Sequence, residues 1–296
     1  MKSEIENRKS KIENLTVFLE LSKVKITFAV ALTTITGYLL AGGSFDIGLI
    51  LPTLGIFLLA CGSSAINHFQ ERDQDAKMER TRNRPIPSGR ISPAGALVFA
   101  FLLSASGSVL LYLGSGMLGM QLGLIALIWY NAIYTPLKKK TAFAVVPGAV
   151  IGSIPPLVGW VAARGHLGDP RAIFMAFFFF IWQVPHFWLL MLKYGDEYVK
   201  AGFPSITQLY TSRQIKHITF IWILATAVSA MMLPVFDVVD SWVVMGGLLI
   251  SSIWLVGQFT RLLSIRDLPF NPIRYFMKIN YFVLAVIIFL SLDRFI

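Results

Sequence analysis

A stripe of oxygen-bearing side chains marks the first polar stretch of the chain. Asn67, Glu71 and Asp75 are spaced four residues apart. On a helix this spacing keeps three side chains within roughly 80° of one face, with about 6 Å between neighbours along the axis. Mg²⁺ takes oxygen ligands and is usually held by one or two carboxylates together with substrate phosphates. The spacing therefore favours a catalytic site at these residues for a magnesium-bound diphosphate, with a solvated helix end as the alternative.

Cationic side chains follow the stripe. A run of arginines begins at Arg80 and is interrupted by prolines, and guanidinium groups carry forked donors that match phosphate oxygens. We expect Arg80 and Arg84 to bind the diphosphate. Three lysines at 138–140 end a later apolar segment. They either anchor that segment at the membrane surface or let Lys138 and Lys139 close over the same diphosphate.

A second polar group lies further along the chain. Asp196 and Glu197 could supply more metal ligands opposite the first stripe, and His186 lies inside an apolar segment. A membrane histidine often makes a hydrogen bond between helices. With a porphyrin substrate it would instead contact the iron or a propionate, as a haem-binding residue. Both interpretations of His186 stay open at this point.

These side chains must be positioned by a membrane bundle. The chain has 296 residues, of which 55% are hydrophobic and 14% charged, and a soluble chain carries about 25% charged residues. Its mean hydropathy is +0.67. Segments of about 20 mostly apolar residues can span a bilayer as helices. Nine segments qualify: 24–43, 46–66, 93–113, 116–135, 143–163, 171–192, 216–236, 240–262 and 275–293. We predict an all-α polytopic membrane protein with nine transmembrane helices and a polar cap.

Lysine and arginine are distributed unevenly around these spans. Of 26 such residues, all but three fall in the N-terminal segment or in loops on the same predicted side. The exceptions are Arg164, Arg171 and Arg294. Positive charge accumulates on the cytoplasmic side of membrane proteins, so we predict a cytoplasmic N-terminus and a cytoplasmic polar cap. This bias also accounts for the net charge of +10, so no nucleic-acid partner is expected. Residues 1–23 are predicted to be a cytoplasmic or interfacial segment, and 24–296 one intramembrane domain.

The motifs resemble those of the UbiA prenyltransferase superfamily. Asn67, Glu71 and Asp75 match its first acidic motif. The continuation to Arg90 resembles the branch of the superfamily that farnesylates protohaem IX, as do segments 136–141, 155–160 and 185–204. The resemblance implies a UbiA-type bundle in the cell inner membrane, Mg²⁺ as cofactor, and farnesyl diphosphate and haem B as substrates. Haem O would be the product, and a downstream haem A synthase is a candidate partner.

Two departures separate the chain from other members of the superfamily. Glu71 stands where the first motif often carries Asp. The second motif of quinone-type members has two Asp residues four apart, and that spacing here gives Asp196 and Lys200. The alternatives are a UbiA-type prenyltransferase that acts on a quinone precursor or lipid, and a transporter. A transporter predicts inverted half-repeats, and the sequence shows no strong internal repeat.

Overall fold

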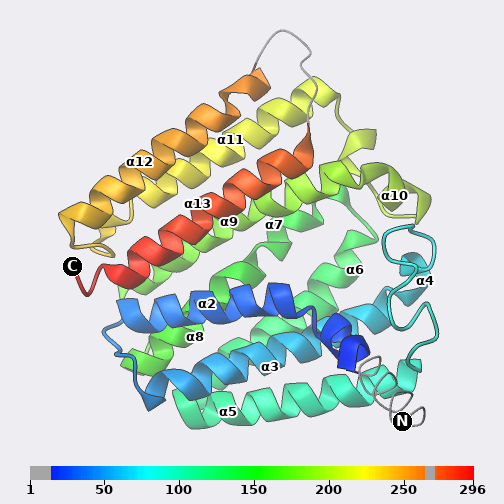
Figure 1. Cartoon of the computed structure of the whole chain (residues 1–296), viewed down its shortest axis with the longest axis horizontal. Coiled ribbons are helices and arrows are strands. Elements are labelled where there is room, and N and C mark those ends of the chain that lie inside the picture. Colours follow the sequence, from blue (N-terminus) through cyan, green and yellow to red (C-terminus); the bar gives the residue numbers. More distant parts are fainter. Residues whose placement is uncertain (1–14, 264–270) are drawn as a thin grey trace, which may run out of the picture.

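The computed structural model describes residues 15–263 and 271–296, and all regular structure within them is helical. The longer helices are α2 (Val24–Leu40), α3 (Ile47–Gln70), α5 (Pro93–Ile128), α8 (Val150–Arg164), α9 (Pro170–Lys193), α11 (Ser212–Met231), α12 (Trp242–Phe259) and α13 (Pro272–Leu292). The shorter helices are α4 (Arg72–Asp75), α6 (Thr135–Lys138), α7 (Val145–Gly148) and α10 (Gly195–Lys200). The long helices form one bundle, and α4 and α10 lie together at one of its ends (Figure 1).

Seven helices among the described residues are long and apolar enough to cross a membrane, by length and composition. The chain is therefore a multi-pass membrane protein. Two regions differ from the nine predicted spans. Helix α2 is apolar but has only 17 residues, and the segment Pro93–Lys138 runs for 46 residues as one element. The count of nine crossings stays a prediction.

The long segment Pro93–Lys138 reverses direction at Gly116. This glycine has φ 66° and ψ −169°, a conformation that favours a residue without Cβ. A Cβ placed on Gly123 would lie 2.5 Å from Cδ1 of Leu111, whereas residues twelve apart on a straight helix are about 18 Å apart. The residues on either side of Gly116 therefore pack against each other as two arms, at the junction predicted between segments 93–113 and 116–135.

Close packing between α2 and α8 depends on glycine. A Cβ on Gly37 would lie 1.9 Å from the carbonyl oxygen of Pro156, and a Cβ on Gly159 would lie 1.9 Å from that of Thr34. The Thr34 hydroxyl also donates to the carbonyl oxygen of Pro155 at 3.0 Å. Two backbones approach this closely only where side chains are absent. This contact holds the first long helix against the centre of the bundle.

The N-terminal segment continues into the bundle through a helix over residues 15–22. Val17 and Leu21 are buried, whereas Leu15 and Leu19 are exposed. Phe18 packs on Phe99 of α5, with ring centroids 4.7 Å apart. The predicted interfacial segment 1–23 is thus described only from residue 15 onward, and residues 1–14 lie outside the described part of the chain.

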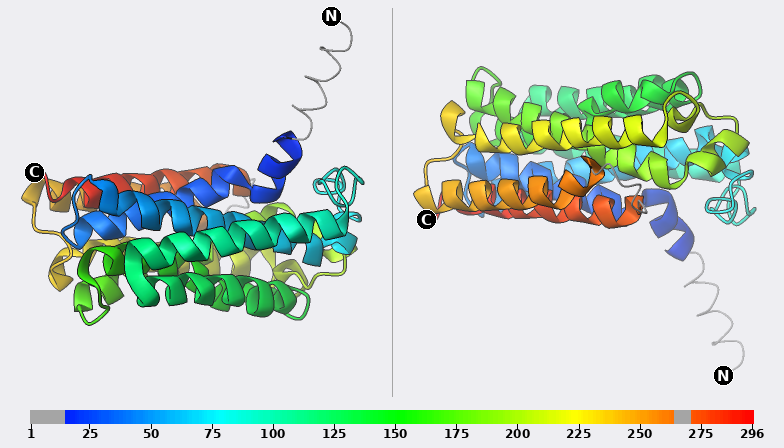
Figure 2. Two further views of the ribbon diagram at one scale, coloured as in Figure 1. Left: turned by 90° about the horizontal axis from the view of Figure 1, so that it is seen from below. Right: turned by 90° about the horizontal axis from the view of Figure 1, so that it is seen from above.

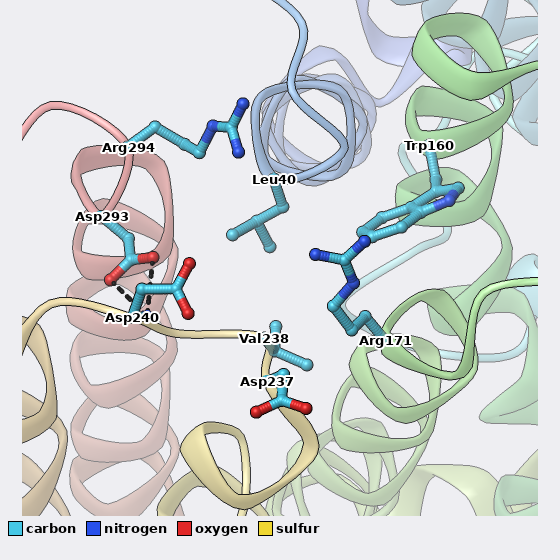
Figure 3. Close-up of a pocket in the computed structure, with 8 residues that line it drawn as sticks. All are labelled: Leu40, Trp160, Arg171, Asp237, Val238, Asp240, Asp293 and Arg294. Carbon is cyan, nitrogen blue, oxygen red and sulfur yellow. Dashed lines mark hydrogen bonds between the residues drawn. The ribbon is translucent and has the colours of Figure 1, made fainter.

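The three arginines that the charge count separated from the rest lie close together. Arg164 and Arg294 both come near Gly42, and the C-terminus that follows Arg294 lies at the end of the bundle opposite α4 (Figures 1 and 2). Arg171 and Arg294 line a small pocket together with Asp237 and Asp240 (Figure 3). The buried carboxylate of Asp293 accepts the backbone N–H of Asp240 at 3.1 Å and that of Ser241 at 3.0 Å. These bonds fix the end of α13 to the start of α12.

Candidate active site

Asn67, Glu71 and Asp75 keep their predicted helical spacing, although the helix that carries them is interrupted. Helix α3 ends at Gln70, and Glu71 has φ −103° and ψ 3° before α4 begins. Even so, the backbone N–H of Glu71 donates to the carbonyl oxygen of Asn67 at 3.0 Å, and that of Asp75 donates to Glu71 at 2.8 Å. These bonds keep the helical register across the break. All three residues are buried, with 1%, 6% and 0% of their surface exposed for Asn67, Glu71 and Asp75.

A different cation contacts each oxygen-bearing side chain of the stripe. Lys23 Nζ donates to Asn67 Oδ1 at 2.8 Å. Lys138 Nζ lies 2.5 Å from Glu71 Oε1. Arg84 Nη1 binds both oxygens of Asp75, at 2.9 Å and 2.7 Å. These six residues, which we call the charge cluster, bring together side chains from four regions of the chain.

The charge cluster alters the ionisation of its members outside the membrane-spanning segments. Burial raises the pKa of the Glu71 carboxyl, but the charge of Lys138 and its hydrogen bond outweigh burial, so that the pKa lies below its usual range. Burial also lowers the pKa of the Lys23 ammonium to about 7, with the charge of Arg84 acting in the same direction and Glu71 opposing it. Glu71 is therefore a carboxylate at neutral pH and a suitable ligand for a cation.

The Asn67 amide has a defined orientation. Lys23 Nζ donates to Asn67 Oδ1, so the carbonyl oxygen of the amide lies on that side. The amide nitrogen then donates to Thr135 Oγ1 at 3.1 Å. Asn67 thus presents its oxygen to the charge cluster, as a metal ligand must.

A π-helix over Trp129–Tyr134 joins the second arm of the α5 segment to α3. The buried side chain of Asn131 accepts from Ser63 Oγ at 2.7 Å and donates to Gln70 Oε1 at 3.2 Å. Gln70 Nε2 in turn donates to the Asn131 carbonyl oxygen at 2.8 Å. π-Helical turns are rare and frequently occur at functional sites. Here the turn precedes Thr135 and Lys138, both of which contact the stripe.

The sequence did not predict a role in the site for Lys23, Asn131 or Thr135. Lys23 counted only as one of many N-terminal positive charges, yet its backbone adopts φ 45° and ψ 49°. Non-glycine residues seldom adopt this left-handed conformation, and such strain concentrates at functional sites. An asparagine at membrane depth is costly and usually functional. Asn131 lies inside the predicted span 116–135, so its position could have indicated a functional residue. Thr135 offered none.

The other predicted diphosphate ligands lie on the outside of the cluster. Arg80 is exposed, and its guanidinium carbon lies 4.6 Å from the centre of the Tyr194 ring. Lys139 is exposed as well, and its Nζ donates to the carbonyl oxygen of Gln70 at 3.2 Å. Of the four predicted residues, Arg84 and Lys138 therefore contact the acidic stripe directly, whereas Arg80 and Lys139 do not.

The second acidic motif meets the loop that follows α4. Glu197, on α10, accepts the backbone N–H of Arg80 at 3.3 Å, and Asp196 is exposed. Within the two described ranges of the chain, no three His, Cys, Asp or Glu side chains are grouped so as to hold a metal ion. A site built from the first stripe needs only two carboxylates, an amide oxygen and phosphate oxygens. Metal binding by Asp196 and Glu197 stays a prediction.

His186 lies among aromatic rings that lead toward the charge cluster. Its ring centroid is 4.7 Å from that of Phe276 on α13 and 5.6 Å from that of Phe187. Phe187 stacks on Tyr134 at 5.8 Å, and Lys138 Nζ lies 5.2 Å from the centre of the Tyr134 ring. Three successive contacts therefore connect His186 with Lys138. His186 Nδ1 also makes a 2.9 Å hydrogen bond with Asn280 Oδ1, the contact between helices that was one of its two interpretations.

Comparisons with known proteins identify the family of the chain. The model of the UbiA prenyltransferase family matches residues 30–280. A protoheme IX farnesyltransferase from Oleidesulfovibrio alaskensis is 34% identical over 274 residues, which cover 93% of this chain and 95% of that protein. Another from Geobacter sulfurreducens is 39% identical over 222 residues, covering 74% and 80% of the two chains.

Solved structures share the fold at lower sequence identity. A digeranylgeranylglyceryl phosphate synthase gives a TM-score of 0.73 at 17% identity, covering 95% of this chain and 98% of that one. A UbiA homologue from Archaeoglobus fulgidus, bound to GPP and Mg²⁺, gives 0.67 at 13% identity, covering 95% and 100%. The family model, the relatives and the fold lead to one conclusion: this chain belongs to the UbiA prenyltransferase family.

Proposed function

We propose that this protein transfers the farnesyl group of farnesyl diphosphate to a vinyl group of protohaem IX, giving haem O. The observation that carries the proposal is the charge cluster, in which each of three buried oxygen ligands faces its own cation. The acceptor is supported by the relatives named protoheme IX farnesyltransferase, which align over most of the chain.

The donor set of the stripe fits Mg²⁺. Two carboxylates and an amide oxygen are hard ligands of the kind this ion prefers, and each already faces a positive charge of the protein. We propose that Asn67, Glu71 and Asp75 hold the ion, with Asp196 and Glu197 nearer the outside of the site. When bound, Mg²⁺ supplies neutralisation of charge on the leaving diphosphate.

The cations of the cluster act on the diphosphate itself. In our proposal Arg84 and Lys138 donate to its oxygens, and Arg80 and Lys139 approach from the exposed side. Donors fixed in place before the reaction stabilise negative charge that develops in the transition state without having to reorganise. The C–O bond to the farnesyl group then breaks, and the electron pair leaves with the diphosphate.

The aromatic region beside the cluster suits the acceptor. Tyr134 and Phe187 stack on each other, and Phe276 packs on His186. In our proposal these aromatic rings stabilise an allylic cation and pack on a porphyrin. The vinyl group attacks the farnesyl cation through its electron pair. Water captures the cation that forms beside the porphyrin and releases a proton, which leaves a hydroxyl group on the product.

We further propose that residues 24–296 form one catalytic domain in the inner membrane, with the N-terminus and the charge cluster on the cytoplasmic side. The lysine and arginine asymmetry supports this orientation. Haem O produced here would then be available to a downstream haem A synthase.

The reaction is tested by incubating the purified protein with haem B, farnesyl diphosphate and Mg²⁺ and identifying the products by mass. We expect a product with the mass of haem B plus one farnesyl group and one hydroxyl group. Asp75→Ala should abolish it, whereas Asp73→Ala, at an exposed position two residues away, should not. Undiminished haem O from Asp75→Ala would refute the metal role of the stripe. Prenylation of a quinone precursor but not of haem B would refute the acceptor.

A further inference from the structure

His186 and Asn280 form a polar contact between α9 and α13, inside an otherwise aromatic region. Asn280 Nδ2 donates to the carbonyl oxygen of Phe276 at 2.8 Å, and Asn280 Oδ1 lies 2.9 Å from His186 Nδ1. A carbonyl oxygen only accepts hydrogen bonds. The amide nitrogen must therefore face Phe276, which leaves Oδ1 facing the histidine.

This orientation decides the histidine tautomer. Because Asn280 Oδ1 only accepts, His186 Nδ1 must carry the proton of that hydrogen bond. In the neutral imidazole, Nε2 then bears a lone pair. His186 Nε2 makes no hydrogen bond with the part of the chain that the structure describes. The residue is only partly buried.

A neutral Nε2 can bind the iron of a porphyrin substrate but cannot form a hydrogen bond with its propionate groups. A propionate is a carboxylate at neutral pH and has no proton to donate to a lone pair. Iron accepts a lone pair. Histidines that bind a metal almost always donate their other ring N–H to an oxygen, which fixes the tautomer and the ring orientation. The contact with Asn280 has this form.

We propose that His186 Nε2 is an axial ligand of the iron of the haem B substrate, and that Asn280 is the positioning residue that holds this tautomer. The inference deepens the proposed function and rests on it. The stacked rings of Phe187 and Tyr134 lie between His186 and Lys138. A haem bound to His186 would therefore be separated from Lys138, and so from the diphosphate, by the rings of Phe187 and Tyr134.

The test uses haem binding and spectroscopy without farnesyl diphosphate. The purified full-length protein is titrated with haem B, and the Soret and resonance Raman spectra are recorded. We expect the spectrum of a histidine-ligated haem in the wild type and its loss in His186→Phe. Asn280→Leu, which removes the acceptor, should weaken haem B binding by about 10- to 100-fold. Asn280→Asp, which retains an acceptor oxygen, should preserve the ligated spectrum.

Metal-free protoporphyrin IX separates ligation from packing. Its binding should change little in His186→Phe and Asn280→Leu, because it has no iron to ligate. Equal weakening of haem B and of the metal-free porphyrin would overturn the proposal, as would an unchanged haem spectrum in His186→Phe. If the wild type binds no haem B, the proposed acceptor fails together with this inference. If haem is ligated by His186 but never farnesylated, only the proposed reaction fails. Thermal unfolding of each variant in detergent identifies any that has lost its fold.

Discussion

Arg84 binds Asp75 through a single nitrogen, which lies 2.9 Å and 2.7 Å from the two carboxylate oxygens. The Asp75 side chain is fully buried, whereas 20% of the Arg84 side chain is exposed. A buried carboxylate without a partner is strongly unfavourable. Arg84 therefore has two roles that experiments must separate, because it compensates a buried charge and also carries a donor suited to phosphate.

Arg84→Met should lower both stability and activity. Loss of one partner from a buried ion pair costs about 3 kcal/mol or more, which thermal unfolding in detergent would register. The double variant Arg84→Met with Asp75→Asn removes both charges and should recover most of the lost stability without recovering haem O formation. Recovery of activity in the double variant would contradict the site assignment.

Lys138→Ala should affect the reaction far more than Lys139→Ala. Lys138 contacts buried Glu71, whereas Lys139 is exposed and donates to a backbone carbonyl. Removing one fixed donor from a transition state costs about 100-fold in rate or more. We expect a loss of this size in kcat/KM for farnesyl diphosphate from Lys138→Ala, and a change within a few-fold from Lys139→Ala. Equal losses from the two variants would favour a general electrostatic role of the lysine run.

Thr135→Val should raise the Mg²⁺ concentration needed for half-maximal activity by about 10-fold. The substitution keeps the shape of the side chain but removes the hydroxyl that accepts from Asn67 Nδ2, so the amide oxygen is no longer held toward the cluster. Thr135→Ser retains the hydroxyl and should restore the wild-type Mg²⁺ dependence. An unchanged Mg²⁺ requirement in Thr135→Val would show that Asn67 needs no such support.

Gly159→Ala should prevent α2 from packing on α8. The added Cβ would lie 1.9 Å from the carbonyl oxygen of Thr34, so the two helices must separate. Overpacking of this kind costs about 3 kcal/mol. Gly246→Ala, on α12, is the matched control because nothing lies within 4 Å of the new Cβ. The melting temperatures of the two variants in detergent should differ clearly, with Gly246→Ala close to the wild type.

Local features of this protein could be predicted from the sequence because they depend on neighbours along the chain. The spacing of Asn67, Glu71 and Asp75 places them along one side of a helix, and the register holds even through the break at Glu71. Apolar runs likewise indicated the helices and the membrane. The uneven distribution of Lys and Arg also placed three arginines on the opposite predicted side from all the others. In the structure these three lie close together at one end of the bundle.

The partners of the stripe were decided only by the tertiary structure. Lys23 reaches Asn67 across 44 residues, and Lys138 reaches Glu71 because the chain reverses at Gly116 and passes through a π-helix. Likewise, the path of the loop after α4 selects Arg84 rather than Arg80 for Asp75. Such contacts depend on how distant segments lie in space. A pattern of residue types along the chain therefore indicates which charges are available, whereas only the folded bundle determines which of them meet.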